Sequence, residues 1–329
     1  MASKKFNIPV SAFSSVMGME ISSIAFHFHR LAAISGFLEY LGVIVYVFLV
    51  LYFVFMVAYR KKILKNKTMV PASFTFAAGS SVLGSRLYMG GFIFFSKILL
   101  LIAIIFIIYP GFLLLAKTIR KREIPEIYFM FMPFIGVLSL ANLFTHLHGA
   151  FNPAISIWIS VSLFVIGNLS WIITVLSFIN YRRYFTYKSL NGFYMIYAGI
   201  SSLSTVSGTL IIENYGLHDN SLYVLIHWIV TVDYAYSVGL SIFLIIFFIL
   251  KIIKNSIDLN YKISIWGAVF PFGVLSSATY LTGEYNHDRF PMTKSDTGTH
   301  IDIAGLKAPC RCVNRFARLN TPINGINIK

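Results

Sequence analysis

Residues 76–85 read FAAGSSVLGS, and residues 98–109 read ILLLIAIIFIIY. The first stretch holds small and hydroxyl side chains, which let helices pack closely in a membrane and whose hydroxyl groups need partners or water. The second stretch consists mainly of large apolar side chains, which suit contact with lipid. Because this contrast recurs along the chain, it predicts one set of helices inside the protein and another set around them.

The composition places the chain in a membrane. Of its 329 residues, 57% are hydrophobic and 12% charged, and the mean hydropathy is +0.75. A soluble domain carries about 25% charged residues, so a water-soluble enzyme is excluded, as is a disordered chain. At about 20 apolar residues per span, the length accommodates roughly nine or ten spans.

Apolar runs bounded by charged residues, Gly or Pro predict nine spans. We expect an all-α membrane protein of repeated helical hairpins, with inner odd-numbered helices around a central pore and outer even-numbered helices facing lipid. A bundle without a pore is the alternative, because small residues alone indicate packing. The predicted spans are 9–28, 31–59, 70–90, 91–116, 125–146, 154–180, 191–212, 221–250 and 263–283.

The basic residues predict an orientation. Most of the 27 Lys and Arg residues precede the first span or follow an even-numbered span. Basic connections lie on the cytoplasmic side of a membrane. We therefore expect a multi-pass protein of the cell (plasma or inner) membrane with a cytoplasmic N-terminus, and the net charge of +15 does not indicate a nucleic-acid partner.

The sequence divides into a transmembrane domain, 1–285, and a polar tail, 286–329. The tail contains Cys310 and Cys312 and several basic residues, although it follows an odd-numbered span. A tenth, outer helix is missing from the repeat. Our hypothesis is that the tail is a truncated or frame-altered end, and the alternative is a nine-span protein with an outward tail.

A candidate gate lies in the ninth span, where residues 266–273 read WGAVFPFG. Pro271 donates no backbone hydrogen bond and its ring crowds the carbonyl of Gly267, which predicts a kink. Phe270 stands at this kink and is expected to close a narrow pore by filling it with apolar bulk. Trp266 begins the same stretch. The alternative is that Phe270 packs in a core.

Polar residues of the inner spans are candidates for contact with a solute. Ser139 and Asn142 are three residues apart and share a helix face. They are expected to hydrogen-bond either a passing solute or a neighbouring helix. Ser80 and Ser202 belong to the same class, and Gly18 is a further candidate for the pore wall.

Charged residues within spans are costly and mark functional sites. Glu20, in the first span, is expected to exchange a proton or pair with a cation. Glu39 and Asp233, on outer spans, are expected to face inward and join helices. Arg86 either attracts anions at the pore mouth or extends to the lipid headgroups.

Histidines and motifs argue against an enzyme. His27 with His29 and His146 with His148 end two spans, which indicates pH sensitivity near neutrality. Residues two apart on a helix do not face each other, so no metal, haem or other cofactor is expected. The sequence also lacks H-E-x-x-H, G-x-S-x-G and a phosphate-binding Walker loop, so no enzymatic activity is predicted.

Four segments together resemble the tellurite-resistance/dicarboxylate transporter family. This family includes the bacterial TehA proteins, fungal malic acid transport and sulfite export proteins, and the plant slow anion channels. Residues 13–18, FSSVMG, resemble its first-helix F-S-x-V-M-G. Residues 74–87 and 197–205 are similar to its third and seventh helices, and residues 266–273 resemble its ninth-helix W-x-x-x-F-P-x-G.

The resemblance implies ten helices, a homotrimer with one pore per subunit, an anionic solute and a pore phenylalanine at Phe270. The absent tenth helix and the acidic Glu20 depart from it. We expect a transporter or channel for small anions, chiefly C4-dicarboxylates such as malate, with tellurite or sulfite as alternative cargo. Different alternatives are a membrane-embedded redox protein using the histidines and a structural membrane subunit.

Overall fold

The computed structural model describes residues 10–59, 69–121, 127–181, 195–217, 221–253 and 266–289. These residues form helices and connecting turns, with no strand among them. The chain divides into two units, Met1–Arg289 and Phe290–Lys329. The second unit, which holds nearly all of the predicted polar tail, lies outside the described residues, so the predicted domain boundary and the hypothesis about the tail stay predictions.

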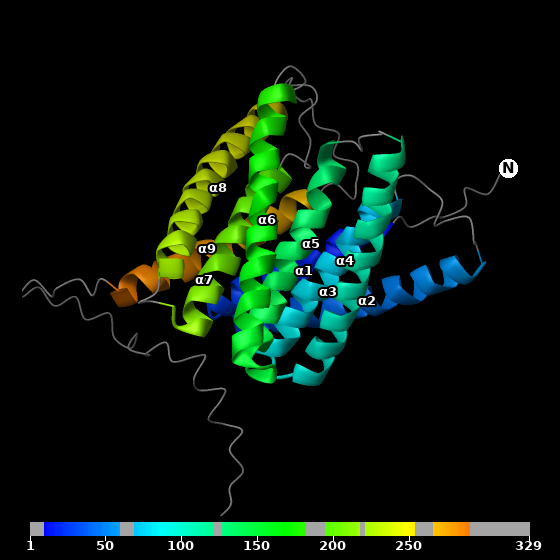
Figure 1. Cartoon of the computed structure of the whole chain (residues 1–329), viewed down its shortest axis with the longest axis horizontal. Helices are drawn as coiled ribbons and strands as arrows, with labels where there is room; N and C mark the ends of the chain where they lie inside the picture. Colours follow the sequence, from blue (N-terminus) through cyan, green and yellow to red (C-terminus); the bar gives the residue numbers. More distant parts are fainter. Residues whose placement is uncertain are drawn as a thin grey trace, which may run out of the picture. The chain divides into compact units, whose positions relative to one another are not determined.

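Each predicted span coincides with a helix, and the predicted all-α fold is confirmed. The largest difference is at the C-terminal end of the last helix, which continues past the expected residue 283. Figure 1 follows the helices in chain order. Over the described residues they are α1 Phe13–Phe28, α2 Ala32–Tyr59, α3 Met69–Met89, α4 Ile93–Lys121, α5 Ile127–His146, α6 Pro153–Tyr181, α7 Met195–Tyr215, α8 Ser221–Ile253 and α9 Trp266–Arg289, with short 3-10 helices η1 Val10–Ala12 and η3 Leu147–Ala150.

The odd-numbered helices form a closed ring. Contacts join α1 to α3, α3 to α5, α5 to α7, α7 to α9, and α9 back to α1. Each of α2, α4, α6 and α8 packs against the odd-numbered helix that precedes it. The chain is therefore built from repeated hairpins of one inner and one outer helix, as the alternation of small and large side chains predicts.

Burial separates the two sets of helices. An 18-residue window of α7 is entirely buried, whereas only 17% of such a window in α2 and 22% in α8 is buried. The outer helices expose large apolar residues such as Phe48, Ile108 and Trp228. In water these surfaces would be unfavourable, so they are the surfaces that face lipid.

Five helices are long and apolar enough to cross a membrane: α2, α4, α5, α7 and α8. In α6 the described side chains form a further apolar stretch, 153–169. Among the described residues α1 does not meet this test because it is 16 residues long, and small and hydroxyl residues lower the hydropathy of α3 and α9. A lower hydropathy is the expected property of helices shielded from lipid by neighbours.

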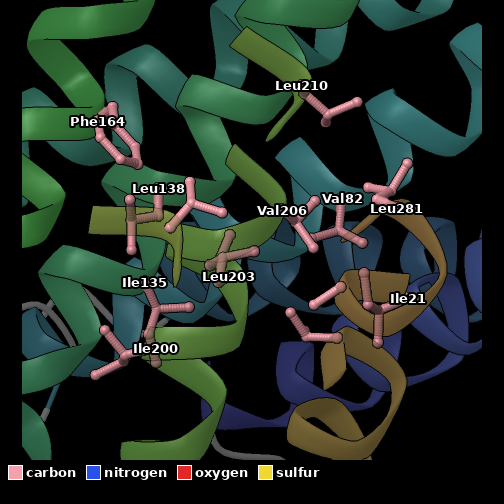
Figure 2. Packing of buried hydrophobic residues seen from close by; sticks show 14 of the residues in the cluster. Ile21, Val82, Ile135, Leu138, Phe164, Ile200, Leu203, Val206, Leu210 and Leu281 are labelled. Atoms are coloured by element: carbon pink, nitrogen blue, oxygen red, sulfur yellow. The ribbon is translucent and has the colours of Figure 1, made fainter. Parts of the chain in front are cut away.

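Apolar side chains from the ring helices meet at its centre. Figure 2 shows part of this cluster, in which Ile21 of α1, Val82 of α3 and Leu281 of α9 lie on one side and Leu138 of α5 lies beside Phe164 of α6 on the other. Close approach between these helices depends on residues that lack a large side chain.

Two glycines illustrate the close approach around α9. A Cβ at Gly199 of α7 would lie 3.0 Å from the Cγ of Pro271, and a Cβ at Gly273 would lie 2.7 Å from the Cγ2 of Ile21. Both contacts hold α9 against its neighbours in the ring. The helix α9 continues through Pro271.

We predict that Gly208→Ala destabilises the protein whereas Gly239→Ala does not. A Cβ at Gly208 in α7 would overlap the side chain of Val230 and approach Phe164 to 3.1 Å, while Gly239 in α8 has no atom within 4 Å of an added Cβ. Overpacking costs about 1–3 kcal/mol, and alanine favours a helix over glycine. Thermal unfolding in detergent measures both variants; equal midpoints would contradict the packing of α7 against α6 and α8.

Candidate functional site

A cavity lies where the ring helices converge. Every odd-numbered helix contributes to its wall, from the middle or the C-terminal half of each helix, so the five inner helices run in the same direction. Its lining residues are Ile21, Ile24, Phe28, Val82, Ser85, Ser139, Asn142, His146, Leu203, Val206, Leu210 and Ser277.

The polar part of the wall is concentrated on α5. Ser139, Asn142 and His146 follow one another at helical spacing and therefore line one stripe, whereas the lining residues of the neighbouring helix α7 are aliphatic. The Oγ of Ser139 and the Oδ1 of Asn142 are buried and have no hydrogen-bond partner among the described residues. Buried polar atoms need partners, so these two are free to bind water or a solute inside the cavity.

Ser80 and Ser202, the other predicted solute-binding hydroxyls, do not belong to the cavity lining. Ser80 exchanges a 2.8 Å hydrogen bond with the Tyr46 hydroxyl of α2 and donates to the carbonyl of Phe76. Ser202 donates to the carbonyl of Ala198 and shares a hydrogen bond with Ser237 of α8. The structure places both serines at contacts between an inner and an outer helix.

The candidate gate residues lie on α9 near the cavity. Phe270 is 2% exposed and belongs to the same apolar cluster as Ile21, Val82 and Leu203, which line the cavity. Pro271 packs against Gly199. Trp266 and Gly267 are in the first turn of α9, and their side-chain environment lies outside the described residues.

Glu20 and Gly18 are buried on α1. The side chain of Glu20 faces α2, because a Cβ at Gly42 would overlap its carboxyl group. Ile21 and Ile24 of the same helix line the cavity. Glu20 is not one of the lining residues, because its carboxyl group is directed at Gly42 of α2.

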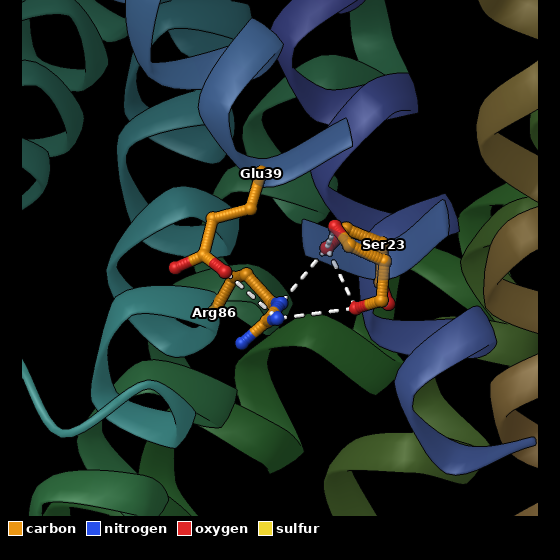
Figure 3. A network of polar contacts seen from close by, with 4 residues as sticks. Ser23, Glu39 and Arg86 are labelled. Carbon is orange, nitrogen blue, oxygen red and sulfur yellow. Dashed lines mark hydrogen bonds and ion pairs between the residues drawn. The ribbon is translucent and has the colours of Figure 1, made fainter. Parts of the chain in front are cut away.

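Arg86, at the C-terminal end of α3, is buried in a polar network. Its Nη2 lies 2.8 Å from Oε2 of Glu39, and it donates from Nε to Ser23 at 2.8 Å and from Nη2 to Ser35 at 3.1 Å (Figure 3). Ser23 and Ser35 also donate to each other's backbone carbonyls, both at 2.8 Å. Glu39 thus joins helices, and Arg86 is held by partners on α1 and α2.

The sequence predicted that His146 confers pH sensitivity but did not predict that it lines the pore wall. Its ring lies 5.8 Å from that of Tyr88 and lines the cavity. His148, two residues later, donates from Nδ1 to the carbonyl of Thr145 at 3.0 Å and contacts Tyr215 instead. The helical spacing of 139, 142 and 146 was the signal that places His146 with the two predicted residues.

Over the described part of the chain, no group of three or more His, Cys, Asp and Glu side chains is arranged to hold a metal ion. His29 and Ser276 share a 3.2 Å hydrogen bond between α1 and α9. The polar groups that line the cavity are hydroxyl, amide and imidazole groups, which bind a solute through hydrogen bonds.

The sequence model of the voltage-dependent anion channel family matches residues 7–295. The match begins just before η1 and extends six residues past α9, so it includes all the ring helices and the whole cavity. No curated protein matches the chain.

We predict that Glu39→Gln lowers the stability by about 2 kcal/mol or more, because it leaves the buried Arg86 guanidinium without its carboxylate. The double variant Arg86→Met/Glu39→Leu is expected to recover most of this loss, since replacing both members of a buried ion pair by apolar residues is often neutral. Thermal unfolding in detergent compares the three proteins. A double variant less stable than Glu39→Gln would contradict a role for the ion pair.

Proposed function

Because the chain belongs to the voltage-dependent anion channel family, a family of channels and transporters rather than enzymes, we propose that its ring of inner helices encloses a path for small anions. The observation that supports this most directly is the cavity, to which all five inner helices contribute and in which Ser139 and Asn142 have unpartnered polar atoms. These groups suit a solute that passes through the ring.

The proposed cargo is a small carboxylate, chiefly a C4-dicarboxylate such as malate. The hydroxyl of Ser139 and an imidazole N–H of His146 can donate hydrogen bonds to carboxylate oxygens, and both residues line the cavity. The unpartnered Oδ1 of Asn142 is an acceptor and suits water or the hydroxyl group of malate. Tellurite and sulfite are the alternative cargo, since their oxygens accept the same bonds. Uptake of labelled malate, tellurite and sulfite into proteoliposomes that contain the protein, measured with and without a pH gradient, ranks these three anions as cargo.

Phe270 is the proposed constriction. It is buried within the ring and packs in the cluster that includes the apolar lining residues. An apolar side chain across a narrow passage excludes water and ions. Pro271 and Trp266 are proposed to hold this part of α9, and Gly18 and Gly267 to allow close packing of the inner helices. Ser80 and Ser202 are proposed to hold outer helices against the ring. Glu20 and Arg86 are proposed to act on the path from behind its wall.

For the assembly we propose a homotrimer in the cell membrane with one path in each subunit and a cytoplasmic N-terminus. The exposed apolar faces of α2, α4 and α8 supply surface both for lipid and for neighbouring subunits. The positions of the Lys and Arg residues in the connections support the orientation.

We predict that Phe270→Ala increases anion flux into proteoliposomes several-fold, because it removes the apolar bulk from the path. Phe272→Ala is the matched control: it lies two residues away on α9 but is 40% exposed, and its flux should equal that of the unmodified protein. Unchanged flux in Phe270→Ala, from protein that conducts anions, would remove Phe270 from the gate.

A second test of the path uses charge. Asn142→Asp places a carboxylate in the cavity, where it repels an anion at low dielectric, and the expected result is at least a ten-fold fall in anion flux, about 1.4 kcal/mol. Asn152→Asp is the control, since Asn152 is exposed, lies outside the cavity and caps α6 through its Oδ1 at 3.0 Å from the Ala154 nitrogen. Equal loss in both variants would show that the charge acts elsewhere than in the cavity.

A further inference from the structure

Glu20 is a buried carboxyl group without a partner. It is fully buried in α1, and neither carboxyl oxygen has a hydrogen-bond partner among the described residues. Leaving an isolated carboxylate in such an environment costs far more than neutralising it. The group is therefore neutral or is paired with something that the protein itself does not supply.

The surrounding charges do not supply that partner. The titratable or charged side chains described on elements packed against α1 are Glu39, Tyr40, Tyr46 and Tyr52 on α2, Arg86 and Tyr88 on α3, and Tyr280 on α9. Of these, Glu39 and Arg86 act on Glu20 electrostatically. Arg86 is the one cation among these described residues, and it forms its ion pair with Glu39. Glu20 is therefore left without a cationic partner among them.

The packing of α2 against α1 leaves no room for a side chain at the position that faces Glu20. A Cβ at Gly42 would overlap the Glu20 carboxyl, so only a glycine in α2 fits beside it. Asp233, a buried acid of α8, differs because only its Oδ2, and not both carboxyl oxygens, is buried without a hydrogen-bond partner among the described residues. A carboxyl held against a helix backbone with no donor nearby is suited to carry its own hydrogen.

We propose that Glu20 is a proton-binding site in the membrane domain, neutral when α1 and α2 pack as they do here, and that loss of its proton loosens this packing. The next residue, Ile21, lines the cavity and contacts Gly273, three residues after Phe270. A shift of α1 away from Gly42 therefore reaches the cavity wall and α9. This second step, regulation of the path by the proton, rests on the proposed function.

The proton site is tested by dicyclohexylcarbodiimide, an apolar reagent that modifies protonated carboxyl groups in membranes. Reconstituted full-length protein is treated at several values from about pH 5.5 to 8.5 and the labelled residue is located by mass spectrometry. Glu20 should be labelled, less so as the pH rises, and Glu39, held in its ion pair, should not. Absence of label on Glu20 throughout, or protection of Glu20 by sodium ions at constant pH, would overturn the proposal.

Two glycine variants test whether the contact between Glu20 and Gly42 defines the labelled site. Gly42→Ala displaces the Glu20 carboxyl from its contact and is expected to reduce the labelled fraction at a fixed pH at least two-fold. Gly36→Ala, on the same helix with no atom within 4 Å of the added Cβ, should label like the unmodified protein. Equal labelling of all three would show that the contact with Gly42 does not define the site.

The regulatory step is tested by anion flux. Glu20→Gln keeps the shape of the protonated acid but does not titrate, so its flux should lose the pH dependence that the unmodified protein shows. Retained pH dependence would overturn regulation by Glu20. If the unmodified protein passes no anion, the proposed function fails while the labelling still decides whether Glu20 binds a proton.

Discussion

A polar group inside a membrane must find a partner, and this constraint sorts the side chains of the inner helices. Those that face outward bond to the surrounding helices: Ser80 to Tyr46, Ser202 to Ser237, and Arg86 to Glu39. Those on the α5 stripe, Ser139 and Asn142, face the cavity and lack such partners among the described residues. The hydrogen bonds thus identify the polar side chains that join the inner helices to their neighbours, whereas the Oγ of Ser139 and the Oδ1 of Asn142 have no such role.

The ring itself depends on small residues at the contacts. Gly199 against Pro271 and Gly273 against Ile21 bring α7, α9 and α1 together with almost no side-chain volume between them. In a lipid environment helix association gains little from the hydrophobic effect and depends on such close packing. Small and hydroxyl residues also lower the hydropathy of the ring helices α3 and α9, which makes them less suited than the outer helices to direct contact with lipid.

The sequence predicted the helices and their inner or outer position well, because both are local properties of composition. The sequence could not show which residues of an inner helix face the cavity and which face a neighbouring helix. Ser139 and Ser202 look alike in sequence, and only the packing of α7 against α8 directs Ser202 away from the cavity. Arg86 was expected to meet an anion or the headgroups because its partners, Glu39 and Ser23, are distant in sequence and nothing local identifies them.

The electrostatics of the cavity favour passage over tight binding. Among the lining residues none is Lys, Arg, Asp or Glu, and the one strongly basic group nearby, Arg86, is already paired. An anion in this cavity meets hydroxyl, amide and imidazole donors, whose hydrogen bonds are weaker than those of a charged group. Conduction requires that a solute enter readily and also leave. Because Glu39 pairs with Arg86, the guanidinium charge is neutralised within the network that joins α1, α2 and α3.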